Sequence, residues 1–281
     1  MRTIDSISRE AIARLKGVSD SPLLDIQILL ADILKRNRAW ILSHPEYELS
    51  LEQVKQFNHT VQRLENGEPL PYILGRWEFY GLELTVSPDT LIPRPESEIL
   101  VEQALAWLRN HSGQRLGVDV GTGSGCVAVS LAYHHPSLSC LATDISSQAI
   151  KIARKNVERY HLSDRVYCLL CDLLPPIKAK IDLICANLPY IPTQRLRGLK
   201  IYDKEPTLAL NGGAQGLELI TRFLQQLGCR LSSVGLILLE IDSSQRDLVM
   251  KIARETFPNE RITCISDLSG QPRVISIQGS G

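Results

Sequence analysis

The sequence predicts an α/β protein with a doubly wound, Rossmann-like sheet, mostly parallel with one antiparallel strand, behind a small N-terminal helical domain. From residue 116 onward, near-continuous apolar segments of strand length alternate with segments of helical period, the pattern of a parallel sheet covered by helices. Residues 1 to about 70 show helical periodicity instead. With 281 residues, the chain is long enough for one large and one small domain.

The N-terminal domain is predicted to contain helices over residues 4–15, 23–34 and 51–64. Ser21-Pro22 is a favourable start for the second helix, and Ser50 with Gln53 three residues later forms a capping box for the third. Glycine and proline then punctuate short runs up to Pro95, which indicates a hairpin between domains. We therefore place a helical domain at residues 1–75, a hairpin linker at 76–95 and the α/β domain at 96–281.

Within the α/β domain, helical periodicity resumes at residues 96–108, and strand-like and helix-like segments then alternate. Strands are predicted at residues 116–120, 139–143, 165–171, 181–186, 235–241, 261–265 and 273–278, and helices near 126–135, 147–160, 217–231 and 244–257. Seven residues separate the last two strands, from Ser266 to Pro272. Such a short connection favours a hairpin, and hence one antiparallel strand.

Composition excludes several classes of protein. Lys plus Arg and Asp plus Glu are 31 each, giving a formal charge of zero, which argues against a strongly basic nucleic-acid-binding surface. No apolar run is long enough to span a bilayer, and the N-terminus lacks a signal-peptide pattern. We expect a cytoplasmic protein without a membrane or stable nucleic-acid partner. Cys168 and Cys171 form one C-x-x-C without a second pair or nearby His, so no metal site is predicted.

A glycine-rich loop joins the first predicted strand of the α/β domain to its first helix. It comprises Gly121, Thr122, Gly123, Ser124 and Gly125, with glycines spaced as G-x-G-x-G. A dinucleotide-binding loop would have a third small residue at the G-x-G-x-x-G position, where this chain has Cys126. The spacing found here is associated with S-adenosylmethionine, although a tight turn uses the same residues.

Acidic residues follow the next two strands. Asp144 comes 23 positions after Gly121, a placement that suits a carboxylate binding both ribose hydroxyls; alternatively it opens a helix through an Asx turn. Asp172 follows the third strand and is expected to face the adenine amino group, with Leu173 against the adenine ring. An Asp before Pro175-Pro176 is also ordinary loop chemistry.

The fourth predicted strand ends abruptly in Asn187, Leu188, Pro189 and Tyr190. This combination suits transfer to a planar amino or amide nitrogen, whose conjugated lone pair makes it a poor nucleophile. The Asn187 side-chain oxygen and the main-chain carbonyl of Leu188 can each accept one N–H hydrogen, and the Tyr190 ring can lie against the planar group. Alternatively, the strand stops because Pro189 cannot continue a ladder.

The order of these features favours an S-adenosylmethionine-dependent N-methyltransferase: G-x-G-x-G after strand one, an acid after strand two and Asn-x-Pro-Tyr after strand four. We assign catalysis to Asn187, Pro189 and Tyr190, and acceptor binding to these residues with Leu188. Asn187 also borders the cofactor. A nucleic-acid amino-methyltransferase is an alternative, because a flipped base presents the same planar amino group, and a cofactor-binding subunit without catalysis is another.

Besides the glycine loop and residues 187–191, several further segments are characteristic: Pro71-Tyr72-Ile73-Leu74-Gly75, Phe79-Tyr80-Gly81-Leu82, Leu91-Ile92-Pro93-Arg94-Pro95-Glu96-Ser97-Glu98, Glu205-Pro206, Ala209-Leu210, Gly212-Gly213 and Asp267-Leu268-Ser269-Gly270. With these segments the chain resembles, over nearly its whole length, the protein-(glutamine-N5) methyltransferases that modify peptide chain release factors. This resemblance implies that the helical domain helps to hold a release factor and that the acceptor is the glutamine of its Gly-Gly-Gln tip. Methylation of a ribosomal-protein glutamine is an alternative that the motif leaves open.

The sequence departs from this family at two positions. Leu188 stands where the usual motif is Asn-Pro-Pro-Tyr, and Asp242 stands where a glycine often follows Glu-Ile. Position 188 is expected to act through its main-chain carbonyl, which the change preserves, and Pro189 biases Leu188 toward an extended conformation.

Overall fold

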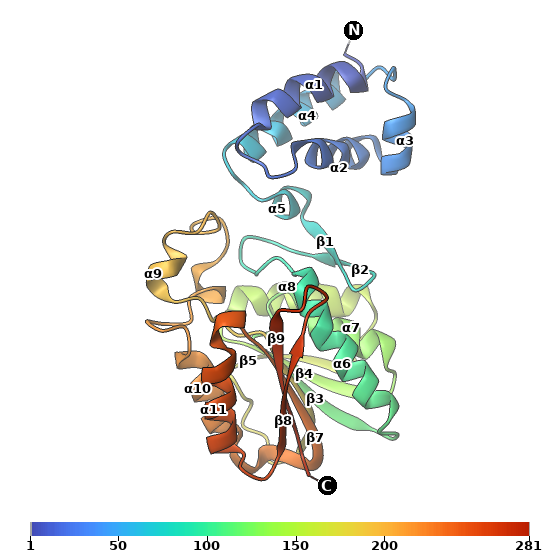
Figure 1. Cartoon of the computed structure of the whole chain (residues 1–281). Coiled ribbons are helices and arrows are strands. Elements are labelled where there is room, and N and C mark those ends of the chain that lie inside the picture. Colours follow the sequence, from blue (N-terminus) through green and yellow to red (C-terminus); the bar gives the residue numbers. More distant parts are fainter. Residues whose placement is uncertain (1, 281) are drawn as a thin grey trace. The chain divides into compact units, whose positions relative to one another are not determined.

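The computed structural model describes residues 2–280, apart from the side chain of Cys229, and divides the chain into two compact units. One unit ends at Arg76 and the other begins at Trp77. Figure 1 shows the elements of each unit in sequence colours. No helix within residues 2–280 combines the length and the apolar character needed to cross a membrane.

The N-terminal unit is helical. It contains α1 (Ile4–Leu15), α2 (Pro22–Leu34), α3 (Arg38–Ser43), α4 (Leu51–Glu65) and α5 (Leu70–Leu74). The capping box predicted for α4 is present: the Ser50 side chain accepts from Gln53 N at 3.2 Å, and Gln53 Oε1 accepts from Ser50 N at 2.9 Å. Pro22 occupies the first turn of α2, and the Ser21 side chain makes no capping bond. The apolar faces of α1, α2 and α4 bury one small core.

A two-stranded hairpin follows, formed by β1 (Arg76–Phe79) and β2 (Leu82–Thr85). Its turn places Tyr80 at φ 50° and Gly81 at φ 74°, the left-handed geometry that two-residue hairpin turns favour. Asn156 lies against β2 and connects it to the larger sheet, as described below.

The second unit is built on a seven-stranded sheet in the order β5-β4-β3-β6-β7-β9-β8. The strands are β3 (Arg115–Val120), β4 (Leu138–Asp144), β5 (Val166–Leu170), β6 (Ile181–Ala186), β7 (Leu231–Glu240), β8 (Arg261–Ser266) and β9 (Pro272–Gln278). Neighbours from β5 to β7 pair in parallel, and β9 runs antiparallel to both β7 and β8. The predicted fold class, with its one antiparallel strand, is therefore confirmed.

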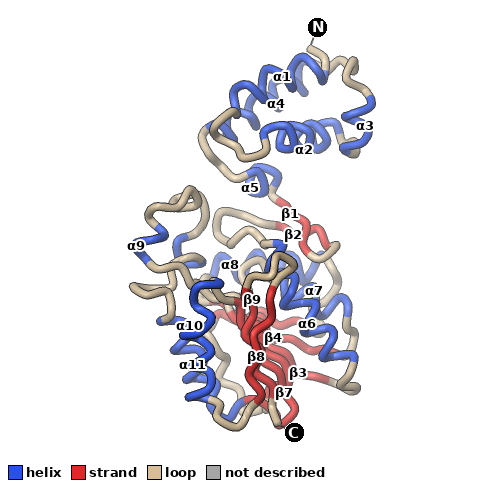
Figure 2. Tube along the Cα trace, in the orientation of Figure 1, coloured by secondary structure: helices blue, strands red, loops and turns tan. Residues whose placement is uncertain are grey.

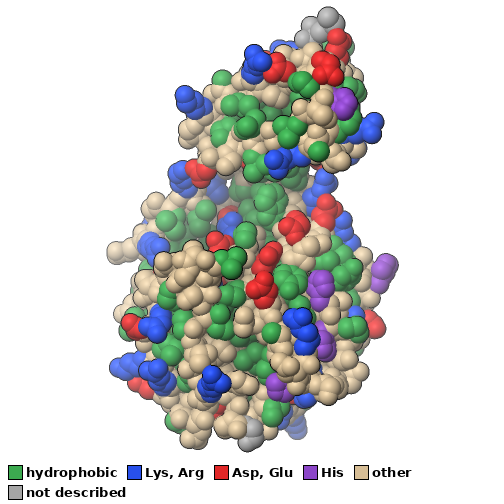
Figure 3. All heavy atoms as spheres, turned by 45° about the vertical axis from the view of Figure 1, so that its right-hand side comes forward, with side chains coloured by type: hydrophobic (Ala, Val, Ile, Leu, Met, Phe, Trp, Pro, Cys, Tyr) green, Lys and Arg blue, Asp and Glu red, His purple; other side chains and the backbone are tan. Residues whose placement is uncertain are grey.

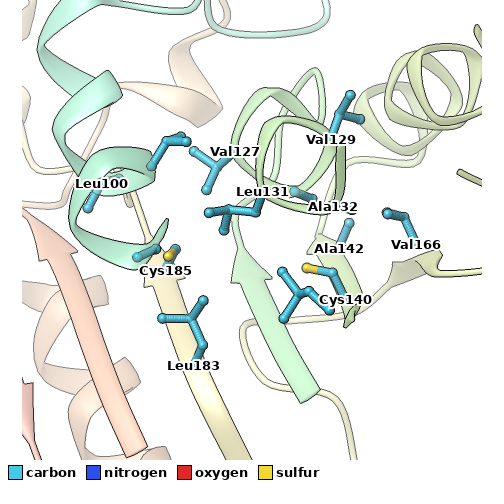
Figure 4. Close-up of a cluster of buried hydrophobic side chains, with 14 of the residues drawn as sticks. Leu100, Val127, Val129, Leu131, Ala132, Cys140, Ala142, Val166, Leu183 and Cys185 are labelled. Carbon is cyan, nitrogen blue, oxygen red and sulfur yellow. The ribbon is translucent and has the colours of Figure 1, made fainter. Parts of the chain in front are cut away.

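Helices cover both faces of this sheet, as the tube in Figure 2 shows. On one face lie α6 (Glu98–Arg109), α7 (Cys126–His134) and α8 (Ser147–Arg159), and on the other α10 (Glu218–Leu227) and α11 (Arg246–Thr256). Each face has its own buried cluster. Figure 4 shows part of the first, where side chains from α7 and from β4 and β6 meet. Burial on both faces explains why the strands read as continuous apolar runs.

The structure corrects the sequence prediction at one junction and adds short elements elsewhere. The helix predicted at 217–231 ends at Leu227, because Gly228 adopts φ 45° and terminates it, and β7 begins at Leu231 rather than at 235. The helices α3, α5 and α9 (Thr193–Leu196) were not predicted. Each is at most six residues long, too short for a hydrophobic period to be recognised.

Asn156 connects three segments of the second unit by hydrogen bonds: α8, β2 and the glycine loop. Its Oδ1 accepts from Thr85 N at 2.7 Å, and its Nδ2 donates to Thr85 O at 2.9 Å and to Ser124 O at 2.8 Å. The side chain is fully buried, and both of its amide groups are satisfied. A buried polar group of this kind specifies which backbone segments lie together.

We expect Asn156→Ala to lower the free energy of unfolding of the second unit by about 2–3 kcal/mol, because buried backbone groups of Thr85 and Ser124 lose their partners. Chemical denaturation followed by tryptophan fluorescence measures the change. Asn110→Ala is the matched control, since that asparagine is exposed at the end of α6, and its effect should stay within about 0.5 kcal/mol. Equal stability of both variants would contradict this role for Asn156.

Candidate active site

The candidate site lies where four neighbouring parallel strands end in one row. Val120 of β3 pairs with Thr143 of β4 and with Ala186 of β6, and Ala186 pairs with Leu239 of β7. The first residues beyond this row are Asp144, Gly121, Asn187 and Glu240, in the order of the strands. Neighbouring strands lie about 4.8 Å apart, so the register places the predicted cofactor and acceptor residues side by side.

The glycine loop turns sharply out of β3. Gly121 adopts φ 71°, and a Cβ there would approach Leu188 Cδ2 to 3.3 Å. Gly125 adopts φ 82°, and a Cβ there would meet Ala153 Cβ at 3.2 Å, so this glycine lets α7 pack closely on α8. Gly121, Thr122, Gly123 and Ser124 line the cavity described below, whereas Gly125 is not among the lining residues.

Asp119, which the sequence analysis did not single out, organises this loop from within β3. Its Oδ2 accepts from Thr122 Oγ1 at 2.6 Å and from Ala128 N at 3.1 Å. Burial raises the pKa of the Asp119 carboxyl to about 6, against the opposing effect of these hydrogen bonds. The available signal was an acid two residues before the first glycine, inside an otherwise apolar strand.

Asp144 lies at the end of β4, beside the glycine loop. Its Oδ2 accepts from Gly123 N at 2.9 Å and its Oδ1 accepts from Ser146 N at 2.8 Å. Burial raises the pKa of Asp144 above its usual value, although these backbone hydrogen bonds oppose the shift. The Asx turn to Ser146 is therefore present. Each carboxylate oxygen keeps a further lone pair for a ligand, so the turn is compatible with the predicted contact to ribose hydroxyls.

Asp172 and Leu173 lie on the cavity wall beyond β5. The Asp172 carboxylate pairs with the Arg222 guanidinium, and both side chains are about half exposed. Leu173 is buried and adopts φ 62°, a strained conformation for leucine, while its carbonyl accepts from Thr143 Oγ1 at 2.8 Å. The proposed contacts of these residues with adenine stay predictions.

Asn187 lies at the end of β6 and takes part in a chain of side-chain hydrogen bonds. Its Nδ2 donates to Ser97 Oγ at 2.9 Å, and Ser97 Oγ donates to Glu240 Oε2 at 2.6 Å. Ser97 belongs to the 3₁₀ turn Pro95–Ser97, and Glu240 is the last residue of β7. Ser97 lies in one of the sequence segments quoted above, but neither it nor Glu240 was predicted to belong to the site, because the two residues are 143 positions apart.

The next three residues are fixed mainly through their backbone. Gln245 Nε2 donates to Tyr190 O at 2.9 Å and to Gly216 O at 3.1 Å. A Cβ on Gly212 would lie 2.7 Å from Pro189 O, so the loop containing Gly212 packs directly on this segment. The Leu188 side chain is buried and packs beside Gly121, which shows where the leucine at this position is accommodated.

Tyr190 differs from the three residues before it in its surroundings. Asn187, Leu188 and Pro189 line the cavity, whereas Tyr190 is not among the lining residues. Its ring packs against the buried cluster under α10 and α11, and its hydroxyl donates to Glu240 Oε1 at 3.4 Å. Burial raises the pKa of Tyr190, and the nearby Glu240 adds to the shift. Contact between its ring and an acceptor stays a prediction.

The rim carries a buried ion pair. Arg94 pairs with Glu205, whose carboxylate is almost fully buried and also accepts from Ile92 N at 3.1 Å. Arg94 and Pro206 both line the cavity, so this pair joins two segments of its wall that are about a hundred residues apart in sequence. At the other departure from the family pattern, Asp242 adopts φ −68° and caps the turn Ser243–Gln245, a conformation that does not require glycine.

These segments enclose one cavity of about 300 Å³. Its wall runs from the glycine loop and Asp144 to Asn187, Leu188 and Pro189. The residues fit S-adenosylmethionine. Apart from its chain neighbours, no protein atom lies within 4 Å of a Cβ placed on Gly123, so this part of the loop leaves room for a ligand. The Asp144 carboxylate lies beside Gly123. Among the described residues, no three His, Cys, Asp or Glu side chains are grouped to hold a metal ion.

Parts of both units match models of known protein families. Residues 6–75 match the PrmC N-terminal domain, and residues 96–199 match the methyltransferase small domain. The chain is 37% identical to the release factor glutamine methyltransferase of Coxiella burnetii, covering 98% of each chain. It is 37% identical to that of Koribacter versatilis, covering 91% of this chain and 90% of the relative.

Solved structures share the fold at lower identity. The hMettl16 catalytic domain in complex with the MAT2A 3'UTR hairpin 1 is 20% identical with a TM-score of 0.54, covering 81% of this chain and 80% of that one. A human METTL16 N-terminal domain in complex with SAH is also 20% identical, with a TM-score of 0.51 over 72% of this chain and 77% of that one. At this identity the likeness shows the fold alone.

We expect Asp144→Ala to weaken S-adenosylmethionine binding at least about tenfold, because the ligand loses charge-assisted hydrogen bonds worth roughly 1.5–3 kcal/mol each. Isothermal titration calorimetry measures the affinity. Asp164→Ala is the control, since that acid is exposed before β5 and should leave the affinity unchanged. Unaltered binding by a folded Asp144→Ala protein would rule out the ribose assignment.

Proposed function

The chain belongs to the family of release factor glutamine methyltransferases, and on that premise we propose which reaction its site performs. The protein transfers a methyl group from S-adenosylmethionine to the side-chain amide nitrogen, N5, of the glutamine in the Gly-Gly-Gln motif of a peptide chain release factor. Relatives covering nearly the whole chain carry this name, and the cavity contains groups suited to such an acceptor.

The observation that carries the proposal is the continuity of the cavity. One wall is the glycine loop with Asp144, and another is Asn187 with Leu188 and Pro189. A methyl donor and a nitrogen acceptor must approach to about 3–3.5 Å in line for transfer. The in-register ends of β3 and β6 bring the two binding segments to adjacent positions, as this approach requires.

Bound S-adenosylmethionine would supply an electrophilic methyl group on a sulfonium sulfur. The amide nitrogen of glutamine is a weak nucleophile because its lone pair is conjugated with the carbonyl. Asn187 Oδ1 and the Leu188 carbonyl can each accept one of its two N–H hydrogens, which fixes the plane of the amide. These hydrogen bonds strengthen as positive charge develops on nitrogen, so they favour the transition state over the ground state.

The N-terminal unit is proposed to supply affinity for the release factor. The cavity, of about 300 Å³, is far smaller than a folded protein, so most of the contact with a release factor must be made outside it. A match of residues 6–75 to a domain characteristic of this family supports that role. On the face drawn in Figure 3, acidic and basic side chains are intermixed, which agrees with a protein substrate better than with a nucleic-acid backbone.

We expect this protein to label a wild-type release factor with methyl groups from S-adenosylmethionine and to leave unlabelled a factor whose Gly-Gly-Gln glutamine is replaced by glutamate. A carboxylate has no nitrogen to methylate and no N–H for Asn187. Incubation with radiolabelled donor, followed by mass spectrometry of the modified peptide, measures the result. Label on the glutamate-containing factor, on a ribosomal-protein glutamine alone or on an exocyclic amino group of nucleic acid would identify a different acceptor.

We expect Asn187→Ala to lower kcat about 100-fold, since loss of one aimed hydrogen-bonding group typically costs about 3 kcal/mol in the transition state. Affinity for S-adenosylmethionine should change by less than about threefold, because the amide is assigned mainly to the acceptor. Single-turnover kinetics and calorimetry separate the two quantities. Asn259→Ala, at an exposed position before β8, is the control; near-normal turnover by Asn187→Ala would contradict the mechanism.

A further inference from the structure

An asparagine amide can be placed in two orientations of almost the same shape, and only one of them suits the proposed reaction. With Oδ1 toward the cavity, Asn187 accepts a hydrogen from the glutamine N–H group. With Nδ2 toward the cavity, two donors face each other. Something in the protein must therefore select the orientation, and the hydrogen-bond partners of the amide determine it.

The hydrogens that each side chain in the network can donate determine which residues select the orientation of the Asn187 amide. An ionised Glu240 carboxylate has no hydrogen to donate, so Ser97 must donate its single hydroxyl hydrogen across the 2.6 Å contact to Glu240 Oε2. The Ser97 oxygen then presents lone pairs toward Asn187, 2.9 Å away. A lone pair requires a donor opposite it. Nδ2 of Asn187 consequently faces Ser97, which leaves Oδ1 at the other corner of the planar amide, pointing away from Ser97.

We propose that Ser97 and Glu240 are positioning residues that hold the Asn187 amide with its oxygen directed toward the substrate glutamine. This inference rests on the proposed function, because it concerns the orientation that a glutamine acceptor requires. Ser97 lines the cavity and Glu240 does not, and both are proposed to act through the Asn187 amide. Glu240 acts on Ser97, and Ser97 acts on Asn187.

The hydrogen bonds from Asn187 through Ser97 to Glu240 form a relay, which burial and neighbouring residues hold in place. Ser97 is 3% exposed and Glu240 is 2% exposed, so water competes little for their hydrogen bonds. Glu240 lies one residue beyond the Ala186–Leu239 pair, as Asn187 does on the neighbouring strand. Its second oxygen, Oε1, accepts from the Tyr190 hydroxyl. Tyr190 thus binds the Glu240 oxygen that Ser97 does not contact.

Ionisation of Glu240 controls the direction of the relay. Burial raises the pKa of Glu240 to about 7, while hydrogen bonds from Ser97 and Tyr190 and the charge of Arg273 lower it and Glu96 raises it. The adjacent Cys126 thiol is neutral in this range, because burial raises its pKa to about 12. A protonated Glu240 can donate to Ser97, whose own hydrogen then faces Asn187 and favours the reversed amide. Activity should therefore fall as pH falls through about 7.

The first test compares substitutions of Ser97. Ser97→Ala should lower kcat for release factor about tenfold, as expected for loss of one orienting hydrogen bond, with KM for S-adenosylmethionine changed by less than about twofold. Ser97→Thr, which keeps the hydroxyl, should retain most of the activity. Ser130→Ala is the matched control, because Ser130 is fully buried on α7 and its hydroxyl has no hydrogen-bond partner among residues 2–280. Wild-type kcat in Ser97→Ala would overturn the proposal.

The second test is the pH profile of kcat, which a merely structural role would not change. Wild-type kcat should fall below about pH 7, whereas Glu240→Gln should give a flat profile between about pH 6.5 and 8, since a glutamine oxygen accepts from Ser97 at any pH. Glu96→Gln should move the wild-type midpoint to lower pH, because Glu96 is an exposed acid that raises the pKa of Glu240. An acid limb that persists unchanged in Glu240→Gln would contradict the relay.

A measurement made without release factor distinguishes failure of the relay from failure of the proposed function. The side-chain ¹⁵N resonance of Asn187 should shift with a midpoint near pH 7 in the wild-type protein and show no such shift in Glu240→Gln. If the wild-type protein labels no release factor, the proposed function fails. If it labels the factor but the Asn187 resonance is independent of Glu240, the relay fails alone.

Discussion

The site depends on the register of four parallel strands. A single row, Thr143–Val120–Ala186–Leu239, runs across β4, β3, β6 and β7. The four strands end at this row or one residue beyond it, and the residues that follow the row immediately carry the chemistry. A shift of one residue in any strand would turn these side chains to the opposite face. The buried apolar clusters on both faces make such a shift costly, so the core also determines the geometry of the site.

Rigidity of the acceptor segment comes from outside the sheet. Once β6 ends, ladder hydrogen bonds no longer fix residues 187–190, and the loop that follows α9 and the turn that follows β7 hold them instead. Gly212 approaches the backbone of Pro189 closely, and Gln245 binds the carbonyl of Tyr190. Because Gly212 has no side chain, the two backbones can come into direct contact. The Gly-Gly signature of the family therefore has a packing explanation in this chain.

The fold and the reaction are separate properties of this molecule. The hMettl16 catalytic domain shares this fold at 20% identity, and a fold by itself does not determine which acceptor is used. Two buried carboxylates, Asp119 on β3 and Glu240 on β7, lie on either side of β6. Asp119 accepts hydrogen bonds that orient the glycine loop, and Glu240 accepts the hydrogen bond from Ser97, which in turn orients the Asn187 amide.

The sequence by itself determined the fold class, the order of the motifs along the chain and the polar residues that follow strands. Each depends on a local pattern: alternating apolar segments, glycines at a turn, or a polar residue directly after a strand. The sequence placed Gly121, Asp144 and Asn187 directly after predicted strands, and the parallel pairing of those strands brings the three residues to one edge of the sheet. Only the tertiary structure decided which residues act on them. Asp119 binds Thr122, Asn156 joins β2 to the glycine loop, and Ser97 connects Asn187 to Glu240. Most of these contacts link residues tens to more than a hundred positions apart, and no periodicity in a single sequence encodes which buried polar groups will meet once both faces of the sheet are packed.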